Sequence, residues 1–251
     1  MAIGLLATCV IMGCGSSPDL DTSRKFQQAE EAFEKAVQPD EFVRVAAMYQ
    51  EILDDGFVSG SVLYNQGNAW MQAQQKGQAI ACYRQAQQHL PRDPYLAANL
   101  SQALKTQPQA KQPLLNYVFF WQQSLSYREK GLLATGLLAV VLLLFLTAGA
   151  TRSSRLASRL GWVAVVAFVL MVGSLARDWY NFEWTSHGVI TVAECTARKG
   201  GSQTYEPAFT QPLTEGTEFS VIQEQNDGLN IQIADSGEAW ISRTECVTYP
   251  R

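Results

Sequence analysis

The chain has 251 residues, a formal net charge of −4 and 17% charged residues, which are ordinary totals for a folded protein of about one to three domains. The mildly acidic balance excludes a strongly basic surface, so nucleic acid is not an expected partner. The charges are unevenly spread along the chain. Two long uncharged runs lie in its second half, between Lys130 and Arg152 and between Arg159 and Arg177.

The first 22 residues resemble a lipoprotein signal segment. An apolar stretch from Met1 ends in Ile-Met-Gly-Cys, so Cys14 would be the lipid-modified residue. Met12 is bulkier than usual there, and no Lys or Arg precedes the apolar stretch. We expect the residues that follow to be exported, with lipidation at Cys14 and a plain membrane anchor as the alternatives.

Residues 23–105 carry a helical hydrophobic pattern that is rich in Gln. Proline and glycine interrupt this pattern at three places: Pro39, Gly56–Gly60 and Pro91–Pro94. Similar residues recur at a fixed interval, since Tyr83 follows Tyr49, and Asn99 follows Asn65, by 34 residues. A fixed interval of this length is typical of stacked helical hairpins.

The central unit, LYNQGNAWMQAQQKGQAIACYRQAQQHLPRDP, resembles a tetratricopeptide repeat (TPR). The resemblance implies that Gly67 lets two helices cross closely and that Pro91 ends the second helix. It also implies that the hairpin is packed by Trp70, Ala79, Tyr83 and Ala86. Weaker flanking units are marked by Phe33, Ala36 and Tyr49 on one side and by Ala97 and Leu100 on the other.

Stacked hairpins of this kind line a concave groove with their first helices, where extended peptides or partner helices bind. Asparagine suits an extended backbone because it both donates and accepts hydrogen bonds. The groove is expected to present Tyr64, Asn65, Asn68, Gln72 and Asn99. The alternative is that these side chains belong only to the ordinary repeat pattern. Glu30, Glu31 and Glu34 are interpreted as parts of solvated helix faces.

Residues 106–130 form a linker followed by an aromatic segment, which would lie along a membrane surface or contact a protein partner. The uncharged runs come next. About 20 apolar helical residues cross a bilayer core. We therefore expect transmembrane helices at 131–150 and 160–177, with Trp162 and Trp179 at the ends of the second. Two buried core helices are the alternative.

The loop between the runs, 151–159, sets the expected topology. It carries Arg152, Arg155 and Arg159 and no acidic residue. Because short positively charged loops stay in the cytoplasm, this loop is expected to be cytoplasmic. Both polar segments would then lie outside, which predicts a bacterial inner-membrane protein whose two soluble domains are periplasmic.

Residues 185–251 change to a period of two, which indicates half-buried strands separated by tight turns. The order GTEFSVIQEQNDGLNIQIADSGEAWIS resembles a bacterial SH3-like domain, a small five-stranded β-barrel, with Trp240 in its penultimate strand. Such domains generally bind peptides or cell-wall fragments. Trp240 and Tyr205 would form an aromatic binding face, or Trp240 would belong to the core.

Cys195 and Cys246 lie near the two ends of this expected barrel, which meet in SH3-like domains. An oxidising compartment would permit a disulfide between them, and two buried thiols are the alternative. Cys82 is interpreted as a small buried hydrophobic residue of a repeat helix.

No set of residues in the sequence indicates catalysis. His89 and His187 lie in different segments, no cysteine pair has zinc spacing, and no phosphate-binding loop is present. We expect no catalytic residue, no metal site and no cofactor.

The fold class expected is thus α + membrane + β: TPR hairpins, two transmembrane helices and an SH3-like barrel. This order resembles the BatE proteins of the Bat aerotolerance operon, with the sharpest local match over Tyr64–Leu100. The resemblance implies envelope partners, among them membrane-anchored von Willebrand A-domain proteins and a MoxR-type ATPase. The function expected is a non-catalytic inner-membrane adaptor, and the alternative is a peptidoglycan-binding protein in which the repeats act as a spacer.

Overall fold

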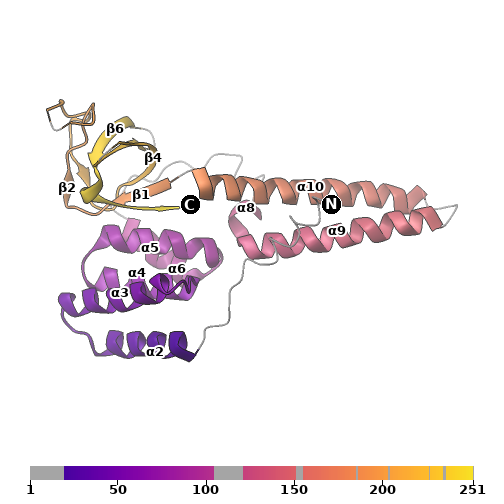
Figure 1. Cartoon of the computed structure of the whole chain (residues 1–251), viewed down its shortest axis with the longest axis horizontal. Coiled ribbons are helices and arrows are strands. Elements are labelled where there is room, and N and C mark those ends of the chain that lie inside the picture. The colour runs from indigo at the N-terminus through magenta and orange to yellow at the C-terminus, as the bar shows by residue number, and fades with distance from the viewer. Residues whose placement is uncertain are drawn as a thin grey trace. The chain divides into compact units, whose positions relative to one another are not determined.

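The computed structural model describes residues 20–104, 121–150, 155–184, 186–202, 204–225, 227–233 and 236–250. The chain divides into two compact units. The larger unit, residues 15–115 and 181–251, contains short helices and an antiparallel sheet (Figure 1). The smaller unit, residues 1–14 and 116–180, contains long apolar helices. Segments from both sides of the uncharged runs therefore belong to one unit.

Within residues 20–104, the described helical part of the larger unit contains five helices in sequence: α2 (Leu20–Lys35), α3 (Pro39–Asp54), α4 (Gly60–Gln72), α5 (Lys76–His89) and α6 (Pro94–Leu104). The helices begin where the sequence supplies caps. Pro39 occupies the first turn of α3, the Ser59 hydroxyl accepts from the Val62 N–H, and the Asp93 carboxylate accepts from the Leu96 N–H. The predicted helical segment and its interruptions are confirmed.

Successive helices pack against one another, and α4 and α5 form the closest pair. A Cβ added to Gly67 would lie 2.6 Å from the Tyr83 ring, so glycine allows the close crossing expected there. Gln66 is buried, and its amide donates 2.9 Å to the Gln50 side chain. The Cys82 thiol donates to the Gln66 side-chain oxygen, so this buried amide is satisfied.

The sheet contains five strands in the order β6-β5-β4-β1-β7. Their bounds are β1 (Ser186–Ile190), β4 (Glu218–Gln225), β5 (Gly228–Ile233), β6 (Gly237–Ser242) and β7 (Cys246–Pro250). All neighbours are antiparallel. Buried residues alternate along β5, where Leu229, Ile231 and Ile233 face the core as the period of two predicts.

The expected closed barrel is not observed in the residues that the structure describes. There β6 and β7 are the two edges of an open sheet, and β2 (Glu194–Cys195) pairs with β3 (Leu213–Thr214) as a separate two-stranded sheet. The expected first strand is interrupted after Ile190, because the chain bends before β2. The backbone of Arg198 makes two hydrogen bonds of 2.8 Å to Trp240 and so covers part of the β6 edge.

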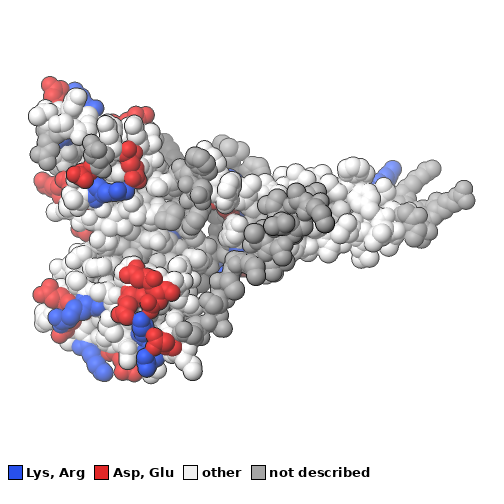
Figure 2. All heavy atoms as spheres, in the orientation of Figure 1, with Lys and Arg blue, Asp and Glu red and all other residues white. Residues whose placement is uncertain are grey.

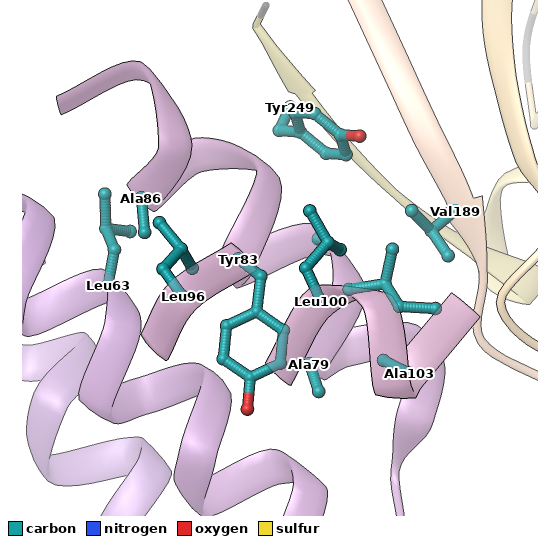
Figure 3. Packing of buried hydrophobic residues seen from close by; sticks show 11 residues of the cluster. Leu63, Ala79, Tyr83, Ala86, Leu96, Leu100, Ala103, Val189 and Tyr249 are labelled. Atoms are coloured by element: carbon teal, nitrogen blue, oxygen red, sulfur yellow. The ribbon is translucent and has the colours of Figure 1, made fainter. Parts of the chain in front are cut away.

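The helices and the sheet share one hydrophobic core. Val189 of β1 and Tyr249 of β7 pack with Leu100 and Ala103 of α6 and with residues of α5 (Figure 3). Both sheet residues are at most 6% exposed. Burying a side chain of this size contributes roughly 1.5–3 kcal/mol. The sheet therefore covers the C-terminal end of the helical array.

The smaller unit contains α8 (Trp121–Ser124), α9 (Tyr127–Ala150) and the first part of α10 (Arg155–Trp184). Two of these helices, α9 and α10, are long and apolar enough to cross a membrane. Their apolar side chains are largely exposed, as Leu132 at 73% and Leu146 at 71% show. Such exposure differs from that of buried core helices, and in Figure 2 the visible part of these helices that is not grey is almost free of charged residues.

The helix boundaries differ from those expected. Helix α9 begins at Tyr127, because Ser126 and Glu129 cap its first turn by accepting from one another's backbone N–H groups. Helix α10 begins at Arg155, so Arg155 and Arg159 lie in this helix rather than in a loop. Arg159 is exposed. Arg152 lies outside the described residues.

A polar cluster joins the beginning of α9 to the last part of α10. The Lys130 ammonium is 2.6 Å from the Asp178 carboxylate and donates to the Gln122 carbonyl, and it is only 2% exposed. Ser174 donates to the Gln122 side chain. Near the opposite ends, the rings of Phe145 and Trp162 meet edge to face. The two helices are therefore antiparallel.

Candidate functional site

An open cavity of about 270 Å³ lies between α2 and α4. Helix α2 contributes Glu30, Phe33 and Glu34, α3 contributes Tyr49, and α4 contributes Asn65 and Asn68. The cavity is formed by the first helices of successive hairpins, which is where the groove was expected. Two of the five predicted groove residues, Asn65 and Asn68, line it.

A hydrogen-bond network fixes the orientation of Asn68. Its side-chain oxygen accepts from the Tyr83 hydroxyl and from the Asn99 amide, each at 2.9 Å. The same Asn99 amide also donates 3.0 Å to the Tyr64 hydroxyl. Because the oxygen of Asn68 takes both donors, its NH₂ group is left to donate to a molecule in the cavity. Tyr64 and Asn99 thus act as supports for Asn68, and Gln72 is an exposed residue outside the cavity lining.

Tyr49 supplies an aromatic wall of the cavity. Its side chain is 1% exposed and forms a hydrogen bond with Asn65. Burial, together with the negative charge of Glu30, raises the pKa of Tyr49 to about 12, against a smaller opposing effect of the Asn65 hydrogen bond. The phenol therefore stays neutral across the physiological pH range.

Glu30 and Glu34 had been interpreted only as solvated residues. Both are exposed, but both also line the cavity. They lie four residues apart and therefore share one face of α2. Their spacing around Phe33 in the sequence indicated that the three residues share one face of a helix. Nothing in the local sequence indicated that α4 would lie across the cavity from this face.

Contacts between α5 and the sheet fix the two parts of the larger unit together. The Gly77 N–H, in the first turn of α5, donates 2.8 Å to the Glu215 carboxylate. The guanidinium of Arg84 donates to both carboxylate oxygens of Glu218, at 2.6 and 2.9 Å. Burial lowers the pKa of Arg84, but the hydrogen bonds and charge of Glu218 outweigh this effect and raise it. Bidentate pairs of this kind hold a defined geometry.

The predicted aromatic face of the sheet is partly formed. Tyr205 is 53% exposed, and its ring covers Gly200. Trp240 lies in β6, the penultimate strand as expected, and is half-buried against Gly201 and Gly228. The two rings thus contact adjacent glycines, with only Tyr205 broadly open to solvent.

Cys195 and Cys246 are thiols in the structure, and the disulfide stays a prediction. The Cys195 thiol donates to the Glu245 carboxylate at 3.4 Å. Burial and the charge of Glu245 raise the pKa of Cys195 to about 12 and that of Cys246 to about 11. Cys82 is buried as expected, and burial raises its pKa to about 12.

The remaining candidates give no further site. Cys14 lies outside the described residues. Among the described residues, no group of three or more His, Cys, Asp or Glu side chains is arranged to hold a metal ion.

Comparisons of the chain with models of protein families, with curated proteins and with solved structures found no match.

Proposed function

We propose that this protein is a non-catalytic membrane adaptor that presents a peptide-binding helical groove on one side of a bacterial inner membrane. The observation that carries the proposal is the cavity between α2 and α4, in which Asn68 offers a fixed pair of donors beside aromatic walls. Fixed donors next to apolar surface suit an extended polypeptide. The TPR resemblance of the central hairpin supports the same conclusion.

The proposal includes two membrane spans, α9 and α10. Their length, their exposed apolar side chains and the arginines near their connection support insertion with that connection in the cytoplasm. The larger unit would then be periplasmic. The sheet, whose sequence over residues 216–242, including Trp240, resembles an SH3-like domain, would serve there as a rigid partner of the helical groove.

The BatE resemblance adds candidate partners to this proposal, namely von Willebrand A-domain membrane proteins and a MoxR-type ATPase. Crosslinking in cells, followed by affinity purification of the full-length protein from detergent, tests them. We expect recovery of a von Willebrand A-domain protein. A photo-crosslinking residue is placed at Phe33 in the cavity lining. If no von Willebrand A-domain protein is recovered with it, the adaptor function is contradicted.

The exposed ring of Tyr205 favours a second candidate, binding of peptidoglycan by the sheet. The test uses the full-length protein in detergent, because residues of the sheet belong to the core of the helices. Retention on purified sacculi that Tyr205→Ala abolishes would support this alternative. If the wild type and Tyr205→Ala are recovered equally in the unbound fraction, peptidoglycan binding by the sheet is contradicted.

A further inference from the structure

Two carboxylates of the cavity have no positive partner among the residues that the structure describes. The other three glutamates of the first hairpin are paired: Glu31 with Lys35, Glu41 with Arg44 and Glu51 with Lys25. Glu30 and Glu34 form no such pair within the described ranges. Since like charges four residues apart on a helix repel one another, the free protein keeps two negative charges at this cavity uncompensated.

The surroundings of these carboxylates suit one kind of ion. The cavity lining also includes the partly exposed ring of Phe33, and a cation is attracted to the face of an aromatic ring. Across the cavity the NH₂ group of Asn68 is directed away from Tyr83 and Asn99. A carbonyl oxygen of a bound polypeptide would accept from it.

The size and donor set exclude other ligand classes. At about 270 Å³ the cavity is smaller than the usual pocket for a cofactor or drug-sized molecule, and it suits one long side chain with its flanking backbone. The cavity lining holds only two carboxylates, and among the described residues no group of three or more His, Cys, Asp or Glu side chains is arranged to hold a metal ion. Phosphorylated or acidic segments would be repelled by Glu30 and Glu34.

We propose that the cavity selects an extended segment of a partner polypeptide by one Lys or Arg side chain, which lies between Glu30 and Glu34 while Asn68 donates to the segment's backbone. This inference rests on the proposed adaptor function and names the chemistry that its groove recognises. Arginine, with its planar fork of donors, would reach both carboxylates and also stack on an aromatic ring.

Full-length protein in nanodiscs tests the proposal by fluorescence anisotropy with four pools of capped, labelled octapeptides. The pools are identical except for a fixed central position that carries Arg, Lys, citrulline or Glu. We expect the Arg and Lys pools to bind about 10-fold more tightly than the citrulline pool, and the Glu pool most weakly. The Glu30→Gln/Glu34→Gln double variant should remove this difference, because it removes both charges.

Glu31→Gln is the matched control, since Glu31 lies on the same helix but is paired with Lys35 outside the cavity lining. It should bind every pool as the wild type does. Asn68→Ala should weaken all four pools by a similar factor. The double variant relieves a repulsion, so thermal unfolding at an unchanged or higher temperature would confirm that it is folded.

The proposal is overturned if the Arg pool binds no more tightly than the citrulline pool, or if the double variant binds it as the wild type does. Self-association of the chain that the double variant abolishes, without binding of any pool, would assign the cavity to a second copy and also overturn it. Failure of the adaptor function is distinguishable. If crosslinking captures an envelope partner equally well with the double variant, the adaptor function stands and the charge selection fails.

Discussion

Gly77 is the point of closest approach between α5 and the sheet. A Cβ added to it would overlap the Ile190 carbonyl oxygen and lie 2.9 Å from the Cα of Thr191. The same residue donates its N–H to Glu215, whose negative charge is favourable at a helix N-terminus. The absence of a side chain and the position in the first turn therefore both serve the contact with the sheet.

Gly77→Ala should destabilise the larger unit even though alanine favours a helix by about 1 kcal/mol. The backbone atoms of β1 cannot yield without breaking strand pairing, so we expect a net loss of roughly 1–3 kcal/mol in the free energy of unfolding. Chemical unfolding of the full-length protein in detergent measures it. Gly136→Ala in α9, where an added Cβ meets nothing within 4 Å, is the control and should not destabilise the protein.

Tyr49 gives a prediction about alkaline pH. Its pKa is about 12 in the folded protein and near 10 when unfolded, so the folded state holds its proton more tightly. The resulting stability is fully present below pH 10 and is lost as the pH rises towards 12. Over this pH interval, the free energy of unfolding of Tyr49→Phe should fall by on the order of 1 kcal/mol less than that of the wild type. Chemical unfolding at several pH values tests this, and Tyr95→Phe, on the exposed surface, should follow the wild type.

The residues of the cavity were only partly predictable. Asn65 and Asn68 follow from the repeat pattern, because a residue's place in a hairpin fixes the face on which it lies. Glu30 and Glu34 belong to the weaker first unit, where charged residues at helical spacing are equally compatible with a solvent-facing surface. Their position opposite Asn65 depends on how α2 and α4 both pack on α3, which no local pattern specifies.

At the scale of elements, the pair Arg84–Glu218 joins a helix to a strand more than 130 residues away in sequence. Each side chain is about one-third exposed. Partial burial reduces screening by solvent, and the bidentate geometry makes such a pair stronger than an isolated surface ion pair.

A double-mutant cycle of Arg84→Met and Glu218→Gln should show a coupling free energy of about 1–2 kcal/mol. Each single variant leaves a polar partner without its hydrogen bonds, whereas the double variant removes both groups. Thermal or chemical unfolding gives the four values that the cycle needs. Additive effects of the two substitutions would show that the pair contributes nothing to the docking of α5 on the sheet.

The elements were more predictable than their limits and their assembly. Prolines and glycines marked the starts of α3, α4 and α6, and alternating residues marked β5. Helix α10 extends back to Arg155 because the sequence from Arg155 to Leu160 contains no residue that ends a helix. The closed barrel was expected from the short strands and from the resemblance to an SH3-like domain, but pairing between β6 and β7 depends on sheet curvature, which the sequence pattern does not specify.

At the scale of the whole chain, the larger unit contains segments from before and after the two long helices. Gly77 can reach Glu215, and Arg84 can reach Glu218, only if both segments lie on the same side of any membrane that the helices cross. Crossing by both α9 and α10 satisfies this requirement, and crossing by one alone does not. The packing of the larger unit thus supports a hairpin independently of the arginines.

Alkaline phosphatase fusions should report this topology. We expect fusions after residue 104 and after residue 251 to be active and a fusion at residue 155 to be inactive, since the enzyme works only in the periplasm. Residues 104 and 251 should agree because their segments pack in one core. Residue 155 should differ because the arginines beside it favour the cytoplasm. Opposite activities at residues 104 and 251 would be incompatible with the core shared by the helices and the sheet.

The position of Val189 and Tyr249 in the helical core also determines when this protein can finish folding. During synthesis, α5 and α6 emerge long before β1 and β7, and both long helices are made in between. Until those strands arrive, the apolar surface around Leu100 has no cover. If α9 and α10 cross a membrane as proposed, a chain in which only one of them crosses would keep β1 and β7 away from this surface and leave it exposed. Under the proposed topology, the core can therefore be completed only after both long helices have been made and correctly placed.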